Sequence, residues 1–447
     1  MLLRFRVSNF RSFGEKTEIS LLAGSRDDDH KNHLVSLPGL DAKVLRTSVV
    51  YGANGAGKSN LYRAVRFFAG LAMGDASRDG KIRFSLFAFT DNGSVASEFE
   101  LIFLSDGNVY GYSINVSRGV ITAEHLAKLV NGRMEPLYDR IVEDDGRLSV
   151  AASCALSEKE KAQAFVGAVN TRSLLSVIGE NIPADQRSRD VNAVVNWFDG
   201  LSFVGPEETF AGSILDQCRN DEFKRFSEAI LNWASGVGGL DVNEHAVNEG
   251  EIRQLISSDK AQGVLDAIHQ RSVVHLKNKA GTEMKLTPGQ DGVVRTMELK
   301  AVHHLENGKV GILDFGEESD GTKRLLNLLP ALYDLLKRDR VCIIDEIDRS
   351  MHAILTRSVL RIFLSSIGRG QLILTTHESS LLDAEIFRRD EIWFAEKDTK
   401  GMTRLYSLND YKKRTRATIR DYYLEGRYGA TPQSINNLAE VQSGGRL

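Results

Sequence analysis

Cysteine is scarce in this chain. Three cysteines occur among 447 residues, and Cys154, Cys218 and Cys342 lie far apart. An odd number at such spacing indicates neither a disulfide framework nor a metal cluster. Cys342 lies within an apolar run, and we expect it to be a small core residue. The low cysteine content is typical of a reducing compartment, so we expect a cytoplasmic location.

The sequence also lacks an excess of positive charge and long apolar runs. The formal net charge is −3, so nucleic acid would have to contact a local patch rather than a positive overall field. No apolar run approaches the roughly 18 residues of a membrane helix. The opening MLLRFRVSNF carries charge too early for a signal peptide. We therefore expect no membrane association, and the length allows two or three domains.

Glycine is concentrated in one short segment, GANGAGKS at 52–59, which fits the pattern G-x-x-x-x-G-K-[ST]. An apolar strand is predicted before it at 47–51, and a helix at 60–68 after it. This context favours a phosphate-binding loop over a chance glycine turn. Backbone N–H groups and the helix N-terminus would surround the phosphates. Lys58 would bridge the β- and γ-phosphates, and Ser59 would bind Mg²⁺.

Two later apolar strands end in residues that suit phosphate chemistry. The run 341–344 is uniformly apolar, as in a parallel sheet that is covered on both faces, and Asp345 and Glu346 follow it. Asp345 suits a position near Mg²⁺, and Glu346 could orient and deprotonate an attacking water. The run 371–376 ends before His377, which could reach the γ-phosphate from a neighbouring strand. The alternative for each is an ordinary strand end.

The order of these motifs resembles ABC-type ATPases of the SMC, RecF and OLD class. The opening segment 4–13 is similar to their first strand, and 375–377 to their switch-histidine segment. ESDGT at 318–322 resembles a divergent ABC signature before a helix expected at 323–336, although an ordinary helix cap would look the same. The closest resemblance is to AAA-type ATP-binding proteins of bacterial phage-defence systems of the AbiL/RloA and PARIS types. It covers 1–125 and 300–430.

The resemblance implies ATP and Mg²⁺ as cofactors, held in a sandwich of two ATPase lobes. The signature of one lobe, with Ser319 and Gly321, would contact the nucleotide of the other. Because the chain has one glycine loop, we expect a homodimer or a larger even oligomer. The implied contacts are nucleotide binding by Arg11, Ser12, Asn54, Gly55, Gly57, Lys58, Ser59, Asn60, Ser319 and Gly321, metal binding by Ser59 and Asp345, and catalysis by Glu346, Lys58 and His377.

We expect an α/β fold, an ABC-type P-loop ATPase head with a mixed sheet, an antiparallel β-subdomain and a helical insertion. Residues 1–150 would form the N-terminal part of the lobe, 151–270 the insertion and 271–447 the C-terminal part. Helical periodicity begins at a capping box of Ser157 and Glu160. The middle of the chain lacks sustained heptads, which favours a short hairpin or a compact bundle. It could bind a partner or DNA, or act as a structural cap.

The C-terminal part of the chain indicates which partners the protein could bind. The segment 411–416 is rich in basic residues, and arginines and tyrosines are interleaved from there to Tyr428, a pattern that can bind nucleic acid or form a solvated helix face. Too few residues follow His377 for the TOPRIM nuclease domain of OLD proteins. We therefore expect an ATPase that controls a separately encoded effector, such as a TOPRIM-like nuclease, or a DNA-bound state in antiviral defence. The alternatives are a RecF/SMC-like DNA repair ATPase and an ATP-gated scaffold with little turnover.

Overall fold

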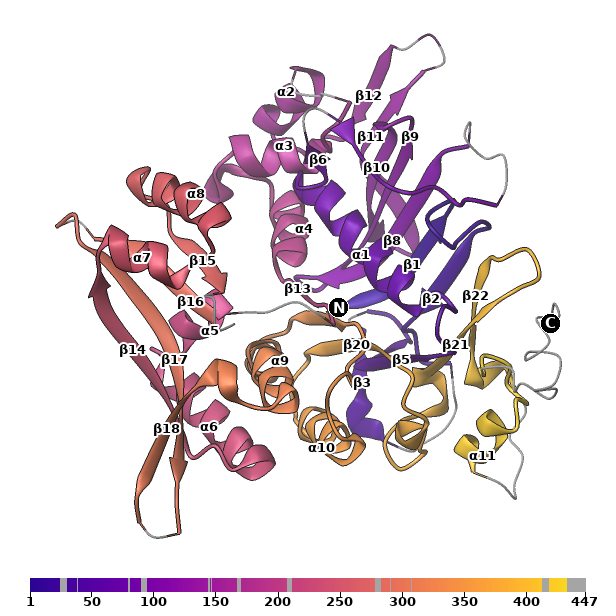
Figure 1. Ribbon diagram of the computed structural model, residues 1–447. Helices are drawn as coiled ribbons and strands as arrows, with labels where there is room; N and C mark the ends of the chain where they lie inside the picture. The colour runs from indigo at the N-terminus through magenta and orange to yellow at the C-terminus, as the bar shows by residue number, and fades with distance from the viewer. Residues whose placement is uncertain are drawn as a thin grey trace, which may run out of the picture. The chain divides into compact units, whose positions relative to one another are not determined.

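The computed structural model describes most of the chain, namely residues 1–24, 30–37, 39–78, 81–89, 95–143, 145, 147–166, 170–206, 211–277, 283–289, 291–306, 308–411 and 418–431. These residues form two compact units (Figure 1). The first unit contains Met1–Phe203, Asp339–Ile347 and Arg369–Leu447, and the second contains Val204–Arg338 and Asp348–Gly368.

The first unit contains a seven-stranded antiparallel sheet in the order β12-β11-β10-β9-β8-β1-β2. Its strands alternate buried and exposed side chains, as a sheet with one solvated face requires. The strands are β1 (Leu2–Ser8), β2 (Thr17–Ser20), β8 (Ser97–Ser105), β9 (Asn108–Ser117), β10 (Val120–Val130), β11 (Arg133–Val142) and β12 (Leu148–Ala152).

A six-stranded mixed sheet carries the glycine loop, in the order β13-β19-β20-β5-β21-β22. Strands β19, β20, β5 and β21 are parallel, and β22 is antiparallel to β21. The three central strands are buried at every position, which explains why most of their side chains are apolar or small. The strands are β5 (Thr47–Tyr51), β13 (Leu201–Val204), β19 (Val341–Ile344), β20 (Gln371–Thr376), β21 (Ile392–Lys397) and β22 (Thr403–Ser407).

Helix α1 (Lys58–Met73) follows β5 and runs beside the seven-stranded sheet, with α3 (Leu174–Asn181) and α4 (Arg189–Asp199) next to it (Figure 1). Phe68 on its inner face stacks on Phe99 of β8, with ring centroids 6.0 Å apart. The helix that begins at the glycine loop is therefore fixed against the antiparallel sheet.

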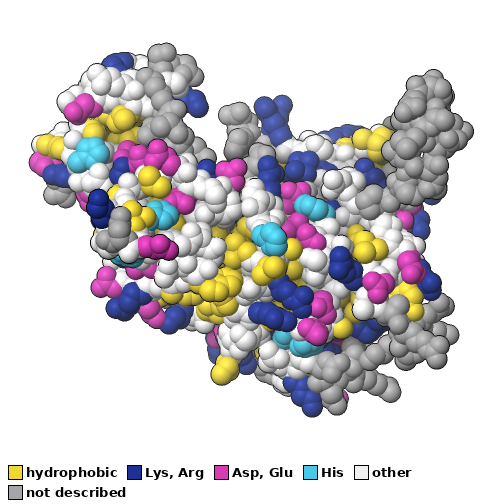
Figure 2. All heavy atoms as spheres, turned by 60° about the horizontal axis from the view of Figure 1, so that its bottom comes forward, with side chains coloured by type: hydrophobic (Ala, Val, Ile, Leu, Met, Phe, Trp, Pro, Cys, Tyr) yellow, Lys and Arg dark blue, Asp and Glu magenta, His cyan; other side chains and the backbone are white. Residues whose placement is uncertain are grey.

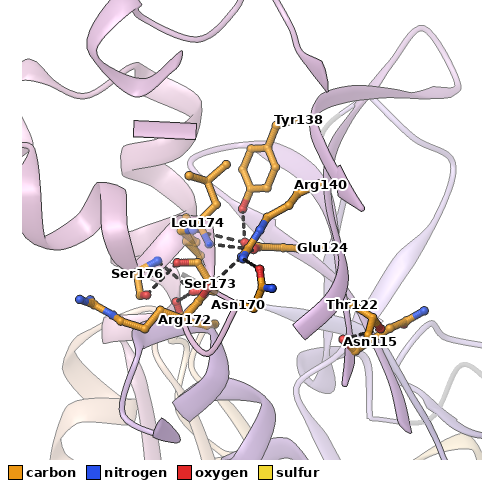
Figure 3. A network of polar contacts seen from close by, with 12 residues as sticks. Asn115, Thr122, Glu124, Tyr138, Arg140, Asn170, Arg172, Ser173, Leu174 and Ser176 are labelled. Atoms are coloured by element: carbon orange, nitrogen blue, oxygen red, sulfur yellow. Dashed lines mark hydrogen bonds and ion pairs between the residues drawn. The ribbon is translucent and has the colours of Figure 1, made fainter. Parts of the chain in front are cut away.

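A buried ionic network joins that sheet to α3 (Figure 3). The hydroxyls of Tyr112 and Tyr138 donate to Oε1 of Glu124 at 2.8 and 2.7 Å, and Arg140 donates to Oε2 at 3.3 Å. Leu174 at the start of α3 donates its backbone N–H to Oε2 at 2.7 Å. Burial and the Glu124 charge raise the pKa of both tyrosines well above the usual value, so their hydroxyls stay protonated as donors.

The second unit is built around an antiparallel sheet, in which β14, β17, β16 and β15 are adjacent in that order and β18 also pairs with β17. A small apolar core lies among its strands and helices, including Ile252, Leu265, Met284 and Leu286. The strands are β14 (Gly239–Val247), β15 (Val274–Lys277), β16 (Glu283–Pro288), β17 (Val294–His304) and β18 (Val310–Asp314).

The remaining elements are shorter or lie outside these sheets. Two pairs of short strands are β3 (Leu34–Ser36) with β4 (Lys43–Leu45), and β6 (Ser77–Arg78) with β7 (Lys81–Ile82). The further helices are α2 (Glu158–Val166), α5 (Ala211–Gln217), α6 (Asp221–Ser235), α7 (Glu249–Leu255), α8 (Ser258–His269), α9 (Asp320–Lys337), α10 (Ala353–Leu364) and α11 (Ile419–Leu424). Within the described residues, none of the helices combines the length and the apolar content that a membrane crossing needs.

The α/β class with a mixed sheet and an antiparallel β-subdomain is confirmed. The capping box at the start of α2 is also present, since Ser157 N donates to Glu160 at 2.7 Å and Glu160 N donates to Ser157 Oγ at 3.3 Å. The segment 151–270, expected as a helical insertion, contains helices but also the strands β13 and β14. Strand β14 forms because nine of its residues pair with β17, a partner too distant in sequence to be anticipated. The three-part domain division stays a prediction.

Candidate nucleotide-binding site

The glycine loop follows β5 directly and ends at the first residue of α1. Gly57 is the N-cap of α1 with φ 110°, and Gly55 has φ 79°, conformations that favour glycine. Gly52 also needs to be glycine, because a Cβ there would lie 2.5 Å from the backbone oxygen of Ala395. Asn54 and Gly55 are exposed at the tip. The bare loop backbone is thus held at both ends and open to solvent between them.

Lys58 is buried, with 7% of its surface exposed, and its ammonium folds back over the loop. Nζ donates to the backbone oxygens of Gly52 at 2.7 Å and Ala53 at 3.1 Å. A lysine side chain held over a glycine loop in this way is positioned to contact a phosphate placed in that loop. Ser59, one residue further, is half-buried at the start of the helix.

Asp345 and Glu346 follow β19, and both contact Thr375 of the neighbouring strand. The Thr375 hydroxyl donates to Asp345 Oδ1 at 2.6 Å and accepts from the backbone N–H of Glu346 at 2.9 Å. Asp345 is 1% exposed. Glu346 has φ 50°, a left-handed conformation that costs a non-glycine residue on the order of 1–3 kcal/mol and often marks a functional position. Thr375 of β20 therefore holds the Asp345 carboxylate and the backbone of Glu346.

The topology brings the candidate groups to one edge of the sheet. Strands β19, β20 and β5 are parallel neighbours, so Asp345, His377 and Gly52 all follow the carboxyl ends of adjacent strands. This edge is where ligands bind in open parallel sheets. His377 is exposed there, directly after β20.

The donor set also fits Mg²⁺. In the described part of the chain, no three His, Cys, Asp or Glu side chains form a ready-made metal cluster. Mg²⁺ commonly binds one or two protein oxygens together with phosphate oxygens and waters, so a full protein cage is unnecessary. The Ser59 hydroxyl and the Asp345 carboxylate could supply oxygen ligands of the required type at the edge where the glycine loop begins.

Ser12, in the segment 4–13, lies next to the glycine loop. Ser12 Oγ accepts from Asn60 Nδ2 at 2.7 Å and lies 2.8 Å from Thr403 Oγ1, and it is 7% exposed. Arg11, with φ 52°, is exposed beside it. Of these residues, Thr403 was not singled out from the sequence, because nothing local distinguishes a threonine at the start of a β-strand.

Ser319 and Gly321 lie in the second unit, at the start of α9. Ser319 is the exposed N-cap, and its side chain accepts from Thr322 N at 3.1 Å. A Cβ on Gly321 would lie 2.9 Å from the backbone oxygen of Ser350, so a larger residue would disturb this helix start. The helix begins at Asp320, earlier than the expected 323, because the Ser319 cap provides its first acceptor. Exposed N–H groups at this helix N-terminus can face an anion.

Residues 412–416 of the basic segment 411–416, expected as a nucleic-acid contact or a solvated face, lie outside the described residues. On the face shown in Figure 2, Lys and Arg side chains are interspersed with Asp and Glu. This distribution agrees with the small net charge of the sequence.

A glycine loop between a buried strand and a helix, with two carboxylates after β19 of the same parallel sheet, is the arrangement of a P-loop nucleotide-binding protein. Residues 48–383, most of the chain, match the model of the family described as "AAA domain, putative AbiEii toxin, Type IV TA system". The chain belongs to this family. No curated protein matches the sequence.

Three similar solved structures are SMC heads. The SMC head domain from Thermotoga maritima has 15% identity over 91% of this chain and 98% of its own, with a TM-score of 0.40. An Smc head bound to the C-winged helix domain of ScpA has 15% identity over 91% and 97%, with a TM-score of 0.43. An Smc head with an extended coiled coil, bound to the C-terminal domain of ScpA from Pyrococcus furiosus, has 14% identity over 96% and 98%, with a TM-score of 0.37. No functional conclusion follows from similarity at this level.

Proposed function

We propose that the protein hydrolyses ATP with Mg²⁺. The observation that carries the proposal is the pair of side chains at one sheet edge, the Lys58 ammonium folded over the glycine loop and the Asp345 carboxylate held by Thr375. The Lys58 ammonium can bind a phosphate, and the Asp345 carboxylate can bind the metal ion that accompanies it. Family membership agrees with this chemistry.

Each residue then has a defined task. Backbone N–H groups of the loop and Lys58 bind the phosphates, and Ser59 and Asp345 hold Mg²⁺, which neutralises phosphate charge when bound. Glu346 orients the attacking water and accepts its proton, and the bond from its own N–H to Thr375 holds its backbone in place. His377 stabilises the γ-phosphate from the end of β20. Asn54, Gly55 and Gly57 supply the loop backbone.

We further propose that two chains close around two nucleotides. The chain has one glycine loop, so a second complete pocket requires a second copy. Ser319 and Gly321 would face the nucleotide that is held by the other copy, because N–H groups at the start of a helix such as α9 can bind an anion. ATP binding would therefore control assembly, and hydrolysis would reverse it.

The proposed purpose of this cycle is to hold and release an effector or a DNA-bound state in defence against phage. The sequence resemblance to the ATPase subunits of AbiL/RloA-type and PARIS-type systems supports it. A separately encoded nuclease or toxin is the proposed partner. Purification of the full chain with its encoded neighbours, with ATP or ADP present, should retain that partner in one nucleotide state only.

Turnover is tested with Glu346→Gln. We expect this variant to bind ATP with unchanged affinity and to lose hydrolysis, since the amide keeps the size of the carboxylate but accepts no proton. Phosphate release and fluorescent-nucleotide binding would be measured side by side. Unchanged hydrolysis would remove Glu346 from the reaction, and absence of ATP binding by the wild-type protein would overturn the proposed function.

Assembly is tested with Ser319→Arg in the Glu346→Gln background. ATP should convert the background protein to a dimer or larger even oligomer in light scattering, and the arginine should prevent this without weakening ATP binding to the monomer. Ser257→Arg is the matched control, because Ser257 is the exposed N-cap of another helix, α8. If Ser319→Arg dimerises like the control, the start of α9 does not contact the second copy.

A further inference from the structure

Thr403, the first residue of β22, is packed against the glycine loop. It is 1% exposed, and its Oγ1 lies 2.9 Å from the backbone oxygen of Ala56 and 2.8 Å from Ser12 Oγ. Its backbone N–H donates to the backbone oxygen of Ser12 at 2.8 Å. A Cβ on Gly57 would lie 2.0 Å from Oγ1, so the threonine fills the space that this glycine leaves.

The protons in this cluster can be assigned by counting. The Ala56 carbonyl has no proton, so the 2.9 Å contact requires the single hydroxyl proton of Thr403. The contact between Thr403 and Ser12 must then use the Ser12 proton, because two oxygens at 2.8 Å need one between them. Ser12 Oγ is left as an acceptor, and Asn60 Nδ2 donates to it at 2.7 Å.

The orientation of Asn60 agrees with this assignment. Its Oδ1 accepts from Arg63 at 3.2 Å, which leaves Nδ2 facing Ser12. The hydrogen bonds therefore run in one direction, from Asn60 through Ser12 and Thr403 to the carbonyl of Ala56. The first and last residues of this series of hydrogen bonds, Asn60 and Ala56, lie in the phosphate-binding segment. Its middle residues come from the segment 4–13 and from β22.

We propose that Thr403 is a positioning residue for ATP binding, and that Ser12 acts through it rather than by donating to the nucleotide. With its proton committed to Thr403, Ser12 cannot donate to a phosphate or a base. The two hydroxyls instead hold the Ala56 carbonyl away from the phosphate side, so that the loop N–H groups face the ligand. This inference rests on the proposed ATP binding.

The test is a double-mutant cycle of Thr403→Val and Ser12→Ala, with the dissociation constant for ATP measured on the full-length chain. Thr403→Val should weaken ATP binding about fivefold, because it removes one net hydrogen bond that holds the glycine loop. Thr403→Ser should restore affinity, since it keeps the hydroxyl. Ser12→Ala should weaken binding in the wild-type protein but add little once Thr403 is valine, because both changes break one chain of hydrogen bonds.

Thr47→Val is the matched control. Thr47 is buried at the opposite end of β5, and its hydroxyl donates to the backbone oxygen of Leu372 at 2.9 Å. It should lower thermal stability as Thr403→Val does but leave ATP affinity unchanged. If Thr403→Val does not fold, Thr403→Ala replaces it in the cycle.

Two results would overturn the inference. One is ATP affinity in Thr403→Val equal to that of the wild-type protein. The other is the same fold-loss from Ser12→Ala in both backgrounds, which would mean that Ser12 contacts the nucleotide directly. A wild-type protein that binds no ATP would instead overturn the proposed function, so the two failures are distinguishable.

Discussion

The hydroxyl of Thr375 donates to Oδ1 of Asp345 at 2.6 Å, although the two residues lie at the ends of different strands. Strands β19 and β20 are parallel, and Ile344 pairs with Leu374, so the next residues of each strand are neighbours. The same oxygen accepts from the N–H of Glu346. One threonine therefore orients both acidic residues of the proposed site.

Thr375→Val should lower ATP turnover about tenfold, because it removes the hydrogen bonds that direct Asp345 and Glu346. ATP affinity without Mg²⁺ should stay close to that of the wild-type protein. Steady-state hydrolysis and binding with and without metal would show this. Thr47→Val, with a buried threonine in the same sheet, should keep full turnover, and equal turnover in both variants would contradict the role of Thr375.

Gly57→Ala should destabilise the protein by about 2–4 kcal/mol, through a left-handed φ and a clash with Thr403. Gly55→Ala is the control, since it has a similar φ strain but open space around the added Cβ. It should cost about 1 kcal/mol. Urea unfolding would measure both, and equal losses would mean that the Thr403 contact does not restrict Gly57.

Glu124→Ala should cost about 3–5 kcal/mol of unfolding free energy, because it leaves Arg140 and two tyrosine hydroxyls buried without their acceptor. Glu18→Ala removes an exposed carboxylate that pairs with Arg6 at 2.6 Å and should cost under about 1 kcal/mol. Denaturant unfolding would measure both losses of free energy. Similar losses would contradict a stabilising role for the network of Figure 3.

Cys154 should be the first cysteine to react with a maleimide in the native protein, because it is exposed while Cys218 and Cys342 are buried. Burial raises the pKa of the Cys218 thiol to about 11, so little thiolate forms at pH 8. Mass spectrometry after brief labelling should find one modified site. Cys154→Ser should then remain unlabelled until denaturant is added, and rapid labelling of that variant would contradict the burial of the other two.

Features that depend on neighbouring residues were predictable from the sequence. The glycine loop, the buried strands before this loop and before the carboxylates, and the capping box of Ser157 and Glu160 are local patterns. Each arises from backbone conformation or periodic burial within about ten residues. Strand β14 was missed because its pairing partners lie 47 to 63 residues away, from Val247 with Val294 to Gly239 with Val302, and its own pattern is largely exposed.

The amino-acid sequence alone predicted the glycine loop, the candidate ligands for Mg²⁺ and the class of protein, because these predictions follow from residue type at fixed local spacing. Only the tertiary structure decided which side chains support them. Thr403 meets Ser12 across 391 positions of the chain, and Thr375 meets Asp345 across 30. Such contacts depend on the order and register of strands. The sequence around a threonine or serine does not predict which distant residue its hydroxyl will contact.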